Sequence, residues 1–353
     1  MNAGGTECWL NTLADGLDPK YYDQYLAYGV CSRGERVGSI SKNFKSVEIR
    51  TLRREINLLR DFRSLLYMVM IIKRIQPDLI VTHTFKAGIL GRLAAFLFHK
   101  GSRRVIHTFH GHLLYGYFGK TMHRLVTFLE LIASRLTSYF IVNGNTVADD
   151  LVQKSILKRG KYEVILPGVV SSKVLRPKII KDEKKKLIVG WMGRFTAVKN
   201  PELVIEIASF FPQVQFVMAG EGELSKSLKK DAPKNVVIKG WTSPKDFWVG
   251  KDICLSTSRN EAAPYNLIEA SSHGITLVAP KVGSIEDVLI HDFNGLLVKG
   301  DLSSYILALS LLLENDDLRT TFGRNGMNLS LEKFSVDRFL GQHKKVFEAL
   351  YAI

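Results

Sequence analysis

The chain has 353 residues, a length that predicts two domains, and its 46% hydrophobic and 24% charged residues exclude a disordered or collagen-like protein. The longest apolar runs, such as Leu65–Ile72, end at charged residues well short of the ~18–20 residues that a membrane span needs. No signal-peptide pattern opens the chain, and its three cysteines (Cys8, Cys31 and Cys254) are scattered. The sequence therefore indicates a soluble cytoplasmic protein without disulfides or a Cys-rich metal site.

The net charge of +15 is concentrated in the first half of the chain. Residues 1–178 contain 27 Lys and Arg against 13 Asp and Glu, whereas residues 179–353 contain 22 against 21. Such an asymmetry favours an anionic partner, either nucleic acid or an anionic membrane face, over a merely well-solvated basic surface. The basic and apolar stretches 88–98 and 120–135 are the candidate membrane faces; ordinary packed helices are the alternative.

Short aliphatic runs alternate with longer amphipathic stretches along the whole chain. This alternation predicts α/β domains with parallel sheets covered by helices on both faces, which bind ligands at the carboxyl ends of their strands. The mixed charged segment 176–186 predicts a linker. The predicted helices include 60–75, 121–136 and 336–350. The predicted strands are 79–81, 103–108, 139–142, 164–166, 187–191, 215–218, 236–238, 253–256 and 276–279.

The segment Gly190–Pro201 carries the strongest local signal. A buried strand ends in glycine and is followed by Arg194 and Lys199, and Asn200-Pro201 then opens a helix. Two cations beside a helix N-terminus suit a diphosphate leaving group, on which negative charge grows as its bond breaks. A surface pair of cations without a ligand is the alternative.

A second signal is a pair of glutamates eight residues apart, Glu261 and Glu269, placed just after the predicted strand 253–256. Glu261 is expected in the strand-end loop and Glu269 in the helix that follows. The backbone N–H groups near Asn266 and Leu267 would then cap a phosphate, and both carboxylates suit the hydroxyls of a sugar or ribose. The alternative is one helix-capping and one solvated glutamate.

Three histidines, His107, His110 and His112, lie within six residues near the end of a predicted strand. A metal site is disfavoured because no Asp, Glu or Cys completes a ligand set nearby. His107 is expected in the core, which leaves His110 as the candidate for a functional hydrogen bond. The Gly4-Gly5 pair, ahead of a helical stretch, is by itself only a weak indication of a loop that approaches a phosphate.

Taken in order, these motifs resemble glycosyltransferase family 4, which comprises retaining enzymes of the GT-B fold. The first half is most similar to a bacterial subgroup that builds surface polysaccharides on lipid carriers. The resemblance covers nearly the whole chain. It is carried by Gly4-Gly5-Thr6-Glu7, His83 to Gly88 with Gly91-Arg92, His110-Gly111-His112, Gly193-Arg194 with Lys199, Gly220-Glu221-Gly222, Glu261 to Glu269, and Val282-Gly283 with Asn294-Gly295.

The resemblance implies two Rossmann-like domains that face a cleft. Residues 1–178 would form the acceptor-side domain, with the last helix (336–353) packed back on it, and residues 187–335 would bind the nucleotide sugar. Members of the family usually begin with a complete buried strand, whereas only Met1-Asn2-Ala3 precede the two glycines here. The first strand of the N-terminal domain is therefore expected to be missing, which suggests a late start or a truncation that abolishes activity. The Ala262-Ala263 pair, where the family often has glycine, is a lesser departure.

The resemblance also implies roles for single residues. Arg194 and Lys199 would neutralise the donor diphosphate, Glu261 would bind the transferred sugar, and His110 would contact it near the reacting carbon. The family needs no metal or other cofactor, and no covalent nucleophile is expected. The implied donor-binding residues are Gly4, Gly5, Gly193, Gly220, Trp241, Asn266, Leu267 and Glu269.

The function expected from these observations is transfer of a sugar, with retention of its anomeric configuration, from a nucleotide-diphosphate donor. The expected donor is a UDP-sugar. The acceptor would be a lipid-linked saccharide or related envelope glycan, and the basic domain would hold the enzyme at the inner face of the cell membrane. Two alternatives stay open: a UDP-sugar 2-epimerase of the same fold, and an inactive binding subunit of a transferase complex. A nucleic-acid binder is disfavoured because no recognised nucleic-acid motif is present.

Overall fold

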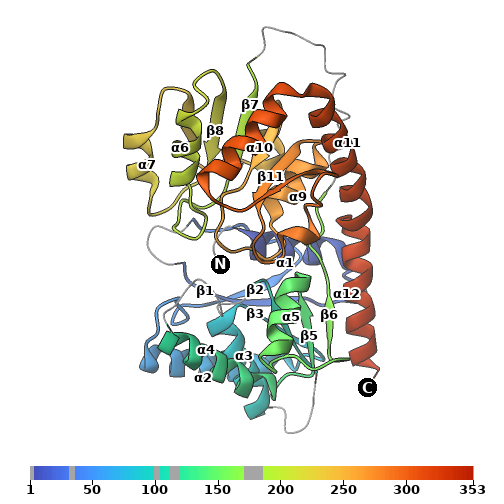
Figure 1. Ribbon diagram of the computed structural model, residues 1–353. Coiled ribbons are helices and arrows are strands. Elements are labelled where there is room, and N and C mark those ends of the chain that lie inside the picture. Colours follow the sequence, from blue (N-terminus) through green and yellow to red (C-terminus); the bar gives the residue numbers. More distant parts are fainter. Residues whose placement is uncertain (1–3, 32–35, 99–103, 112–119, 171–185, 353) are drawn as a thin grey trace. The chain divides into compact units, whose positions relative to one another are not determined.

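A computed structural model describes residues 4–31, 36–98, 104–111, 120–170 and 186–352 of the protein (Figure 1). The chain divides into two compact units. The first comprises Met1–Gly168 and Val336–Ile353, and the second comprises Val169–Ser335. The division falls ahead of the segment 176–186, in which the sequence predicts a linker and of which only Lys186 is described.

The centre of the first unit is a parallel sheet in the order β3-β4-β5-β6. All five residues of β4 are buried, as expected for a strand covered on both faces. The register pairs His83 with Thr108 and Phe109 with Val142, so β3, β4 and β5 end at one edge of the sheet. The strands are β3 (Ile80–His83), β4 (Val105–Phe109), β5 (Tyr139–Val142) and β6 (Tyr162–Val164).

Helices of the first unit bury residues at helical spacing. In α2 the buried residues include Leu65, Met68 and Ile72, and the Asn57 side chain caps the helix by accepting from the Arg60 N–H (3.0 Å). Helices α1 and α12, from the two ends of the chain, share one apolar cluster. The helices are α1 (Gly5–Gly16), α2 (Leu58–Ile75), α3 (Phe85–Phe98), α4 (Lys120–Ser134), α5 (Asn145–Gln153) and α12 (Val336–Tyr351).

Two short strands that no sequence pattern predicted form a separate parallel pair. They are β1 (Tyr25–Gly29) and β2 (Lys45–Ile49). Only Ile49 among their ten residues is fully buried, so neither strand carries the continuous apolar run by which a buried strand is recognised. Within the described part of the first unit, no strand joins this pair to the four-stranded sheet.

The second unit contains a six-stranded parallel sheet in the order β12-β11-β10-β7-β8-β9. Its apolar core includes Trp191, Phe195, Phe216 and Tyr305. The strands are β7 (Ile188–Met192), β8 (Gln215–Ala219), β9 (Val236–Lys239), β10 (Ile253–Leu255), β11 (Thr276–Pro280) and β12 (Gly295–Val298). The helices are α6 (Glu202–Ser209), α7 (Ser225–Asp231), α8 (Pro244–Phe247), α9 (Tyr265–Ser272), η1 (Ile285–Asp287), α10 (Leu302–Glu314) and α11 (Asp316–Lys333).

The α/β architecture with parallel sheets is therefore confirmed in both units. Each strand predicted from an apolar run is present, with ends that differ by at most two residues. The strand around 164–166 is displaced to Tyr162–Val164, and β12 was not predicted. Among the helices of the described residues, none is long and apolar enough to cross a membrane.

Candidate active site

The loops that follow β7 and β8 approach each other closely in the second unit. The Gly193 N–H donates to the Ala219 carbonyl (3.0 Å), and Gly220 has a φ of 148°. A Cβ atom at residue 220 would lie 1.8 Å from the Gly193 carbonyl oxygen, so only glycine fits there. The glycines at 193 and 220 thus bring the two strand-end loops together at the carboxyl edge of the sheet.

Lys199 and Glu261 meet at this edge. Lys199 Nζ lies 2.5 Å from Glu261 Oε1, and the Ser258 hydroxyl donates to the same oxygen at 2.7 Å. The side chains of Lys199 and Glu261 are 21% and 8% exposed, so the pair is sheltered but reachable. The ammonium keeps further N–H donors for an anionic ligand, because Lys carries three.

The loop that holds Glu261 is fixed through its main chain. Ser284 N–H donates to the Glu261 carbonyl (3.1 Å), and Gly283, with a φ of 52°, would place a Cβ only 1.8 Å from that oxygen. In the first turn of α9, the Asn266 side-chain amide donates to the Met192 carbonyl at the end of β7 (3.0 Å). The main-chain N–H groups of Asn266 and Leu267 are consequently held beside the end of β7.

Glu269 lies in α9, eight residues after Glu261; the residue as a whole is partly exposed, but its carboxyl group is buried. Burial raises the pKa of its carboxyl to about 8, although a contact with Trp248 acts to lower it. The same carboxyl lies near the buried Cys254, whose pKa is raised by burial and then by Glu269. A carboxyl group of this kind can exchange its proton when a ligand offers it hydroxyl groups.

Two further predicted residues lie nearer to solvent. Arg194 is exposed on the loop after β7. Trp241 is 50% exposed, and its main-chain N–H donates to a carboxylate oxygen of Glu221, in the loop after β8 (3.4 Å). An exposed indole that is fixed by its main chain at the sheet edge is suited to contact a planar base.

In the first unit, Gly4 has a φ of 150° at the start of α1, and nothing lies within 4 Å of a Cβ built there. Its N–H donates to the Glu7 carboxylate (3.1 Å), which also accepts from the Ser39 N–H (2.6 Å). Gly5 is the first residue of α1. The two glycines therefore form an open main-chain surface at a helix N-terminus, held in place by Glu7.

His110 directly follows β4, and its imidazole forms a hydrogen bond inside the first unit. His110 Nε2 lies 2.9 Å from Nδ1 of His83, and its other ring nitrogen is buried. Burial lowers the pKa of His110 well below its ordinary value and that of His83 to about 3, so both rings are neutral at pH 7. His107 is a core residue, as expected, and is bonded to Thr82 (2.9 Å); His112 lies outside the described residues.

Two participants were not identified from the sequence, Ser258 and the pairing of His83 with His110. The hydroxyl run Ser256-Thr257-Ser258 just before Glu261 was an available signal for the first. The second depends on the register of β3 against β4, which no local pattern reports. In the described parts of the chain, no group of three or more His, Cys, Asp or Glu side chains is arranged to hold a metal ion.

Comparison with solved structures defines the class of this fold. Sucrose-phosphate synthase from Thermosynechococcus elongatus matches with a TM-score of 0.80 at 18% identity, over 99% of this chain and 94% of that one. Anabaena HepE in complex with UDP-glucose matches with a TM-score of 0.78 at 19% identity, over 99% and 97%. Both are glycosyltransferases of the GT-B class, and the fold of this protein is GT-B.

Sequence comparison identifies the family. A model of Glycosyltransferase Family 4 matches residues 3–173, and a model of Glycosyl transferases group 1 matches residues 172–329. The chain belongs to glycosyltransferase family 4 and is a glycosyltransferase.

Its relatives include the UDP-Gal:alpha-D-GlcNAc-diphosphoundecaprenol alpha-1,3-galactosyltransferase of Escherichia coli, 27% identical over 84% of this chain and 82% of that protein. Another is the capsular polysaccharide biosynthesis glycosyltransferase CapM of Staphylococcus aureus, 23% identical over 91% and 84%. Both relatives are thus bacterial glycosyltransferases, and CapM is one of capsular polysaccharide biosynthesis.

Proposed function

We propose that the protein transfers a sugar, with retention of anomeric configuration, from a UDP-sugar to a polyprenyl-diphosphate-linked saccharide or related envelope glycan. The observation that carries the proposal is the cluster of Lys199, Glu261 and Ser258 beside the first turn of α9. It combines a cation, a carboxylate and helix N–H groups at the ligand-binding edge of a parallel sheet. The name of the Escherichia coli relative gives a UDP-sugar donor and a lipid-diphosphate acceptor, which supports the same classes here.

The proposed division of labour in the second unit follows the chemistry of each group. Arg194, Lys199 and the N–H groups of Asn266 and Leu267 neutralise the donor diphosphate as it leaves, and this electrostatic work requires no metal ion. Glu261 accepts hydroxyls of the transferred sugar, and Glu269 accepts those of the ribose. The departing phosphate helps to deprotonate the acceptor hydroxyl, so no covalent nucleophile takes part.

Gly193 and Gly220 give the donor close access to the main chain, and Trp241 contacts its base. From the first unit, Gly4 and Gly5 offer main-chain contacts to the phosphate or sugar. The ring nitrogens of His110 are directed into the first unit. We therefore assign the contact of His110 with the sugar to its main chain, which the ring anchors.

A panel of nucleotides tests the donor site directly. UDP at about 100 times its Kd should stabilise the wild-type protein by about 2.7 kcal/mol against unfolding, whereas GDP, ADP and CMP should not. Glu269→Ala should abolish the stabilisation, because the ribose hydroxyls lose their acceptor. Glu206→Ala, at an exposed glutamate of α6, is the matched control and should respond like wild type. A folded protein that no nucleotide stabilises would contradict the proposal.

The same site predicts a pH dependence. Because the pKa of Glu269 is raised to about 8, the carboxyl is protonated at pH 7, and the carboxylate that accepts ribose hydroxyls forms only as pH rises. UDP should therefore bind about fivefold more tightly at pH 8, and about tenfold more tightly at pH 9, than at pH 7, with proton release measurable by calorimetry in two buffers. In Glu269→Gln the affinity should be low and independent of pH over this range.

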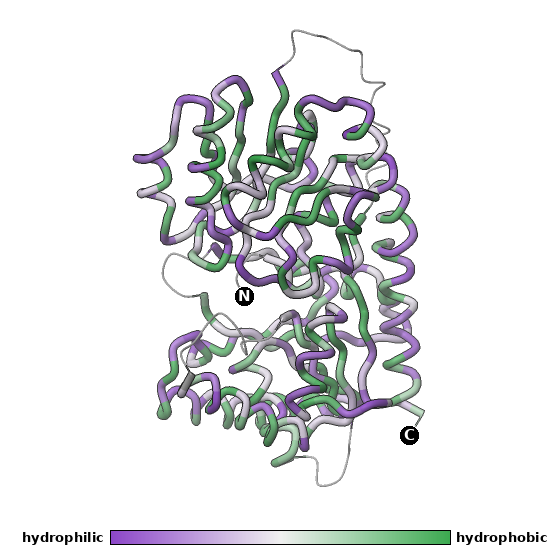
Figure 2. Tube along the Cα trace, viewed as in Figure 1, coloured by the Kyte–Doolittle hydropathy of each residue, from purple (hydrophilic) through white to green (hydrophobic). Residues whose placement is uncertain are grey.

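The proposal places the enzyme on an anionic membrane through its first unit. One face of α2 exposes Leu59, Phe62, Leu66 and Met70, at helical spacing and at 77%, 59%, 47% and 63% exposure. Helix α4 exposes Met122, Leu125, Phe128 and Ile132 in the same manner. Figure 2 shows hydrophobic and hydrophilic residues interleaved along these helices. Such apolar faces match the boundary of a bilayer.

The charges of α2 and α4 favour lipid over a neutral partner. Each helix contains a single acidic residue, and both point inward: Asp61 lies 2.5 Å from Lys86, and Glu130 lies 2.9 Å from Arg92. Among the described side chains of the two helices, those that are exposed and carry a full charge are all cationic, namely Arg63, Lys73, Arg74 and Arg124, and the exposed Arg135 directly follows α4. Cations next to a bilayer of anionic lipid contribute about 1 kcal/mol each.

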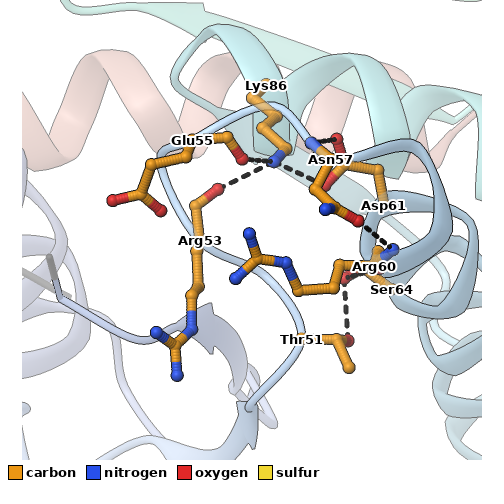
Figure 3. A network of polar contacts seen from close by, with 8 residues as sticks. All are labelled: Thr51, Arg53, Glu55, Asn57, Arg60, Asp61, Ser64 and Lys86. Atoms are coloured by element: carbon orange, nitrogen blue, oxygen red, sulfur yellow. Dashed lines mark hydrogen bonds and ion pairs between the residues drawn. The ribbon is translucent and has the colours of Figure 1, made fainter.

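A polar network fixes the start of α2 (Figure 3). Besides its ion pair with Asp61, Lys86 of α3 donates to the carbonyls of Arg53 (2.9 Å) and Glu55 (2.6 Å). Asp61 accepts from the Asn57 N–H (3.0 Å). These bonds therefore hold the start of α2, from which the exposed apolar face of the helix continues.

Replacing Leu59 and Phe62 together by serine should weaken binding to phosphatidylglycerol vesicles by at least tenfold, since each buried side chain of this size contributes about 1.5–3 kcal/mol. Cosedimentation with vesicles measures the effect. The matched control, Leu307→Ser with Leu331→Ser, removes two exposed leucines of the second unit and should bind like wild type. Equal binding to neutral phosphatidylcholine vesicles would rule out the anionic component.

A further inference from the structure

Among the buried side-chain nitrogens of the first unit that have no hydrogen-bond partner in the described residues, three belong to one cluster of rings: Trp9 Nε1, His110 Nδ1 and His343 Nε2. They come from α1, from the residue after β4 and from α12. The plane of the Trp9 ring is close to perpendicular to both histidine rings (87° and 75°), with centroids 5.1 Å from His110 and 5.2 Å from His343. Buried polar atoms nearly always have partners, because an unsatisfied one keeps its full desolvation cost. This cluster therefore calls for a partner that the side chains do not supply.

The hydrogen-bonding roles of two of these nitrogens are fixed. An indole Nε1 can only donate. His343 Nδ1 lies 2.8 Å from the Phe339 carbonyl, which can only accept, so Nδ1 carries the hydrogen. Burial lowers the pKa of His343 to about 4, although that hydrogen bond acts to raise it, so the ring is neutral at pH 7. His343 Nε2 must then be an acceptor.

The role of the third nitrogen depends on the His83–His110 pair. Both rings are neutral, and one of them donates across the 2.9 Å contact between His83 Nδ1 and His110 Nε2. If His110 donates from Nε2, its buried Nδ1 is an acceptor. If His83 donates instead, His110 Nδ1 carries a hydrogen and is a donor.

One water molecule satisfies the first of these arrangements completely. It accepts from Trp9 Nε1, donates to His343 Nε2 and donates to His110 Nδ1, which uses both of its hydrogens and gives the three bonds typical of a buried water. In the second arrangement the water accepts twice and one O–H stays unbonded in the interior. The count of donors and acceptors therefore selects the Nε2–H tautomer of His110.

We propose that Trp9, His110 and His343 bind a single buried water, and that His343 acts through it as a positioning residue for His110. The water site rests on the three unpartnered nitrogens and the ring contacts that join them, whereas its effect on catalysis rests on the proposed function of His110. The two ends of the chain, α1 and α12, would then jointly fix a residue at the ligand-binding edge of the first sheet. Neither α1 nor α12 alone supplies all the partners of the water.

The water and the tautomers are measurable without any substrate. A crystal structure of the full chain should show one water within hydrogen-bond distance of all three nitrogens. Nitrogen-15 NMR of histidine-labelled protein should give His343 as the Nδ1–H tautomer and His110 as the Nε2–H tautomer. In Trp9→Phe the water should be lost or displaced. The proposal is overturned if the crystal shows no water there while the three rings stand as described.

Three variants separate positioning from packing. His343→Phe keeps the ring volume without the acceptor and should lower kcat about tenfold with an unchanged KM for the donor. His343→Gln, which retains an acceptor and a donor, should stay within about threefold of wild type. Phe339→Leu disturbs the same cluster but carries no polar side-chain atom, so His110 should keep its tautomer. Equal losses in the Phe and Gln variants, or a His343→Phe protein with an unaltered His110 spectrum, would refute the positioning role.

Discussion

Lys199→Ala should lower kcat by about 10²–10³-fold, the loss measured when one preorganised group that stabilises transition-state charge is removed. Lys199 Nζ is sheltered, contacts Glu261 at 2.5 Å and stands at the strand edge where the proposed diphosphate departs. Negative charge on that diphosphate grows as the bond to the sugar breaks, so the ammonium acts mainly on the transition state. KM for the donor should therefore change much less than kcat.

The measurement is initial rates over a range of donor concentrations, with folding checked by thermal unfolding. Lys281→Ala is a matched control, since Lys281 also forms an ion pair in the second unit, with Glu286 at 3.0 Å, but both partners are exposed. Its rates should equal those of wild type. A Lys199→Ala enzyme within threefold of wild type in kcat would remove Lys199 from the proposed chemistry.

Sequence patterns identified the second unit well, for a physical reason. Strands of a parallel sheet are buried on both faces and appear as continuous apolar runs such as Ile188–Met192, and the functional loops follow directly at their ends. The contact between Lys199 and Glu261 was not predicted, because it depends on β7 and β10 being neighbours in the sheet although β8 and β9 separate them along the chain. The missed strand Gly295–Val298 lies at the sheet edge and begins with a glycine, which weakens that signal.

The first unit was less predictable because its interactions join distant parts of the chain. Strands β1 and β2 are mostly exposed and carry little apolar pattern. Trp9 and His343 meet only because α1 and α12 pack together, and the apolar face of α2 is visible only once the buried face is known. Helical periodicity shows that α2 has a buried side, but the exposure of Phe62 follows from tertiary packing.

The largest loss of stability is expected from Arg92→Met. Arg92 has 0% exposure, and its guanidinium donates to the Gly88 carbonyl (3.0 Å) and to Glu130 (2.9 Å), whose side chain is 4% exposed. Removing the cation leaves a buried carboxylate without its partner, which typically costs about 3–5 kcal/mol. The loss should exceed that of Arg135→Met, a control at an exposed arginine just after α4.

A second substitution distinguishes the buried charge from lost packing. Arg92→Met with Glu130→Leu should recover most of the stability, because no uncompensated charge remains. Burial already raises the pKa of Glu130, and in Arg92→Met the favourable charge of Arg92 is gone, so the native carboxyl binds its proton more tightly than the unfolded one. The free energy of unfolding of Arg92→Met should therefore fall as pH rises from 5 to 8, whereas that of the double variant should not. Urea unfolding followed by circular dichroism measures both, and a double variant no more stable than the single one would show that packing around Arg92, rather than the charge of Glu130, dominates the loss.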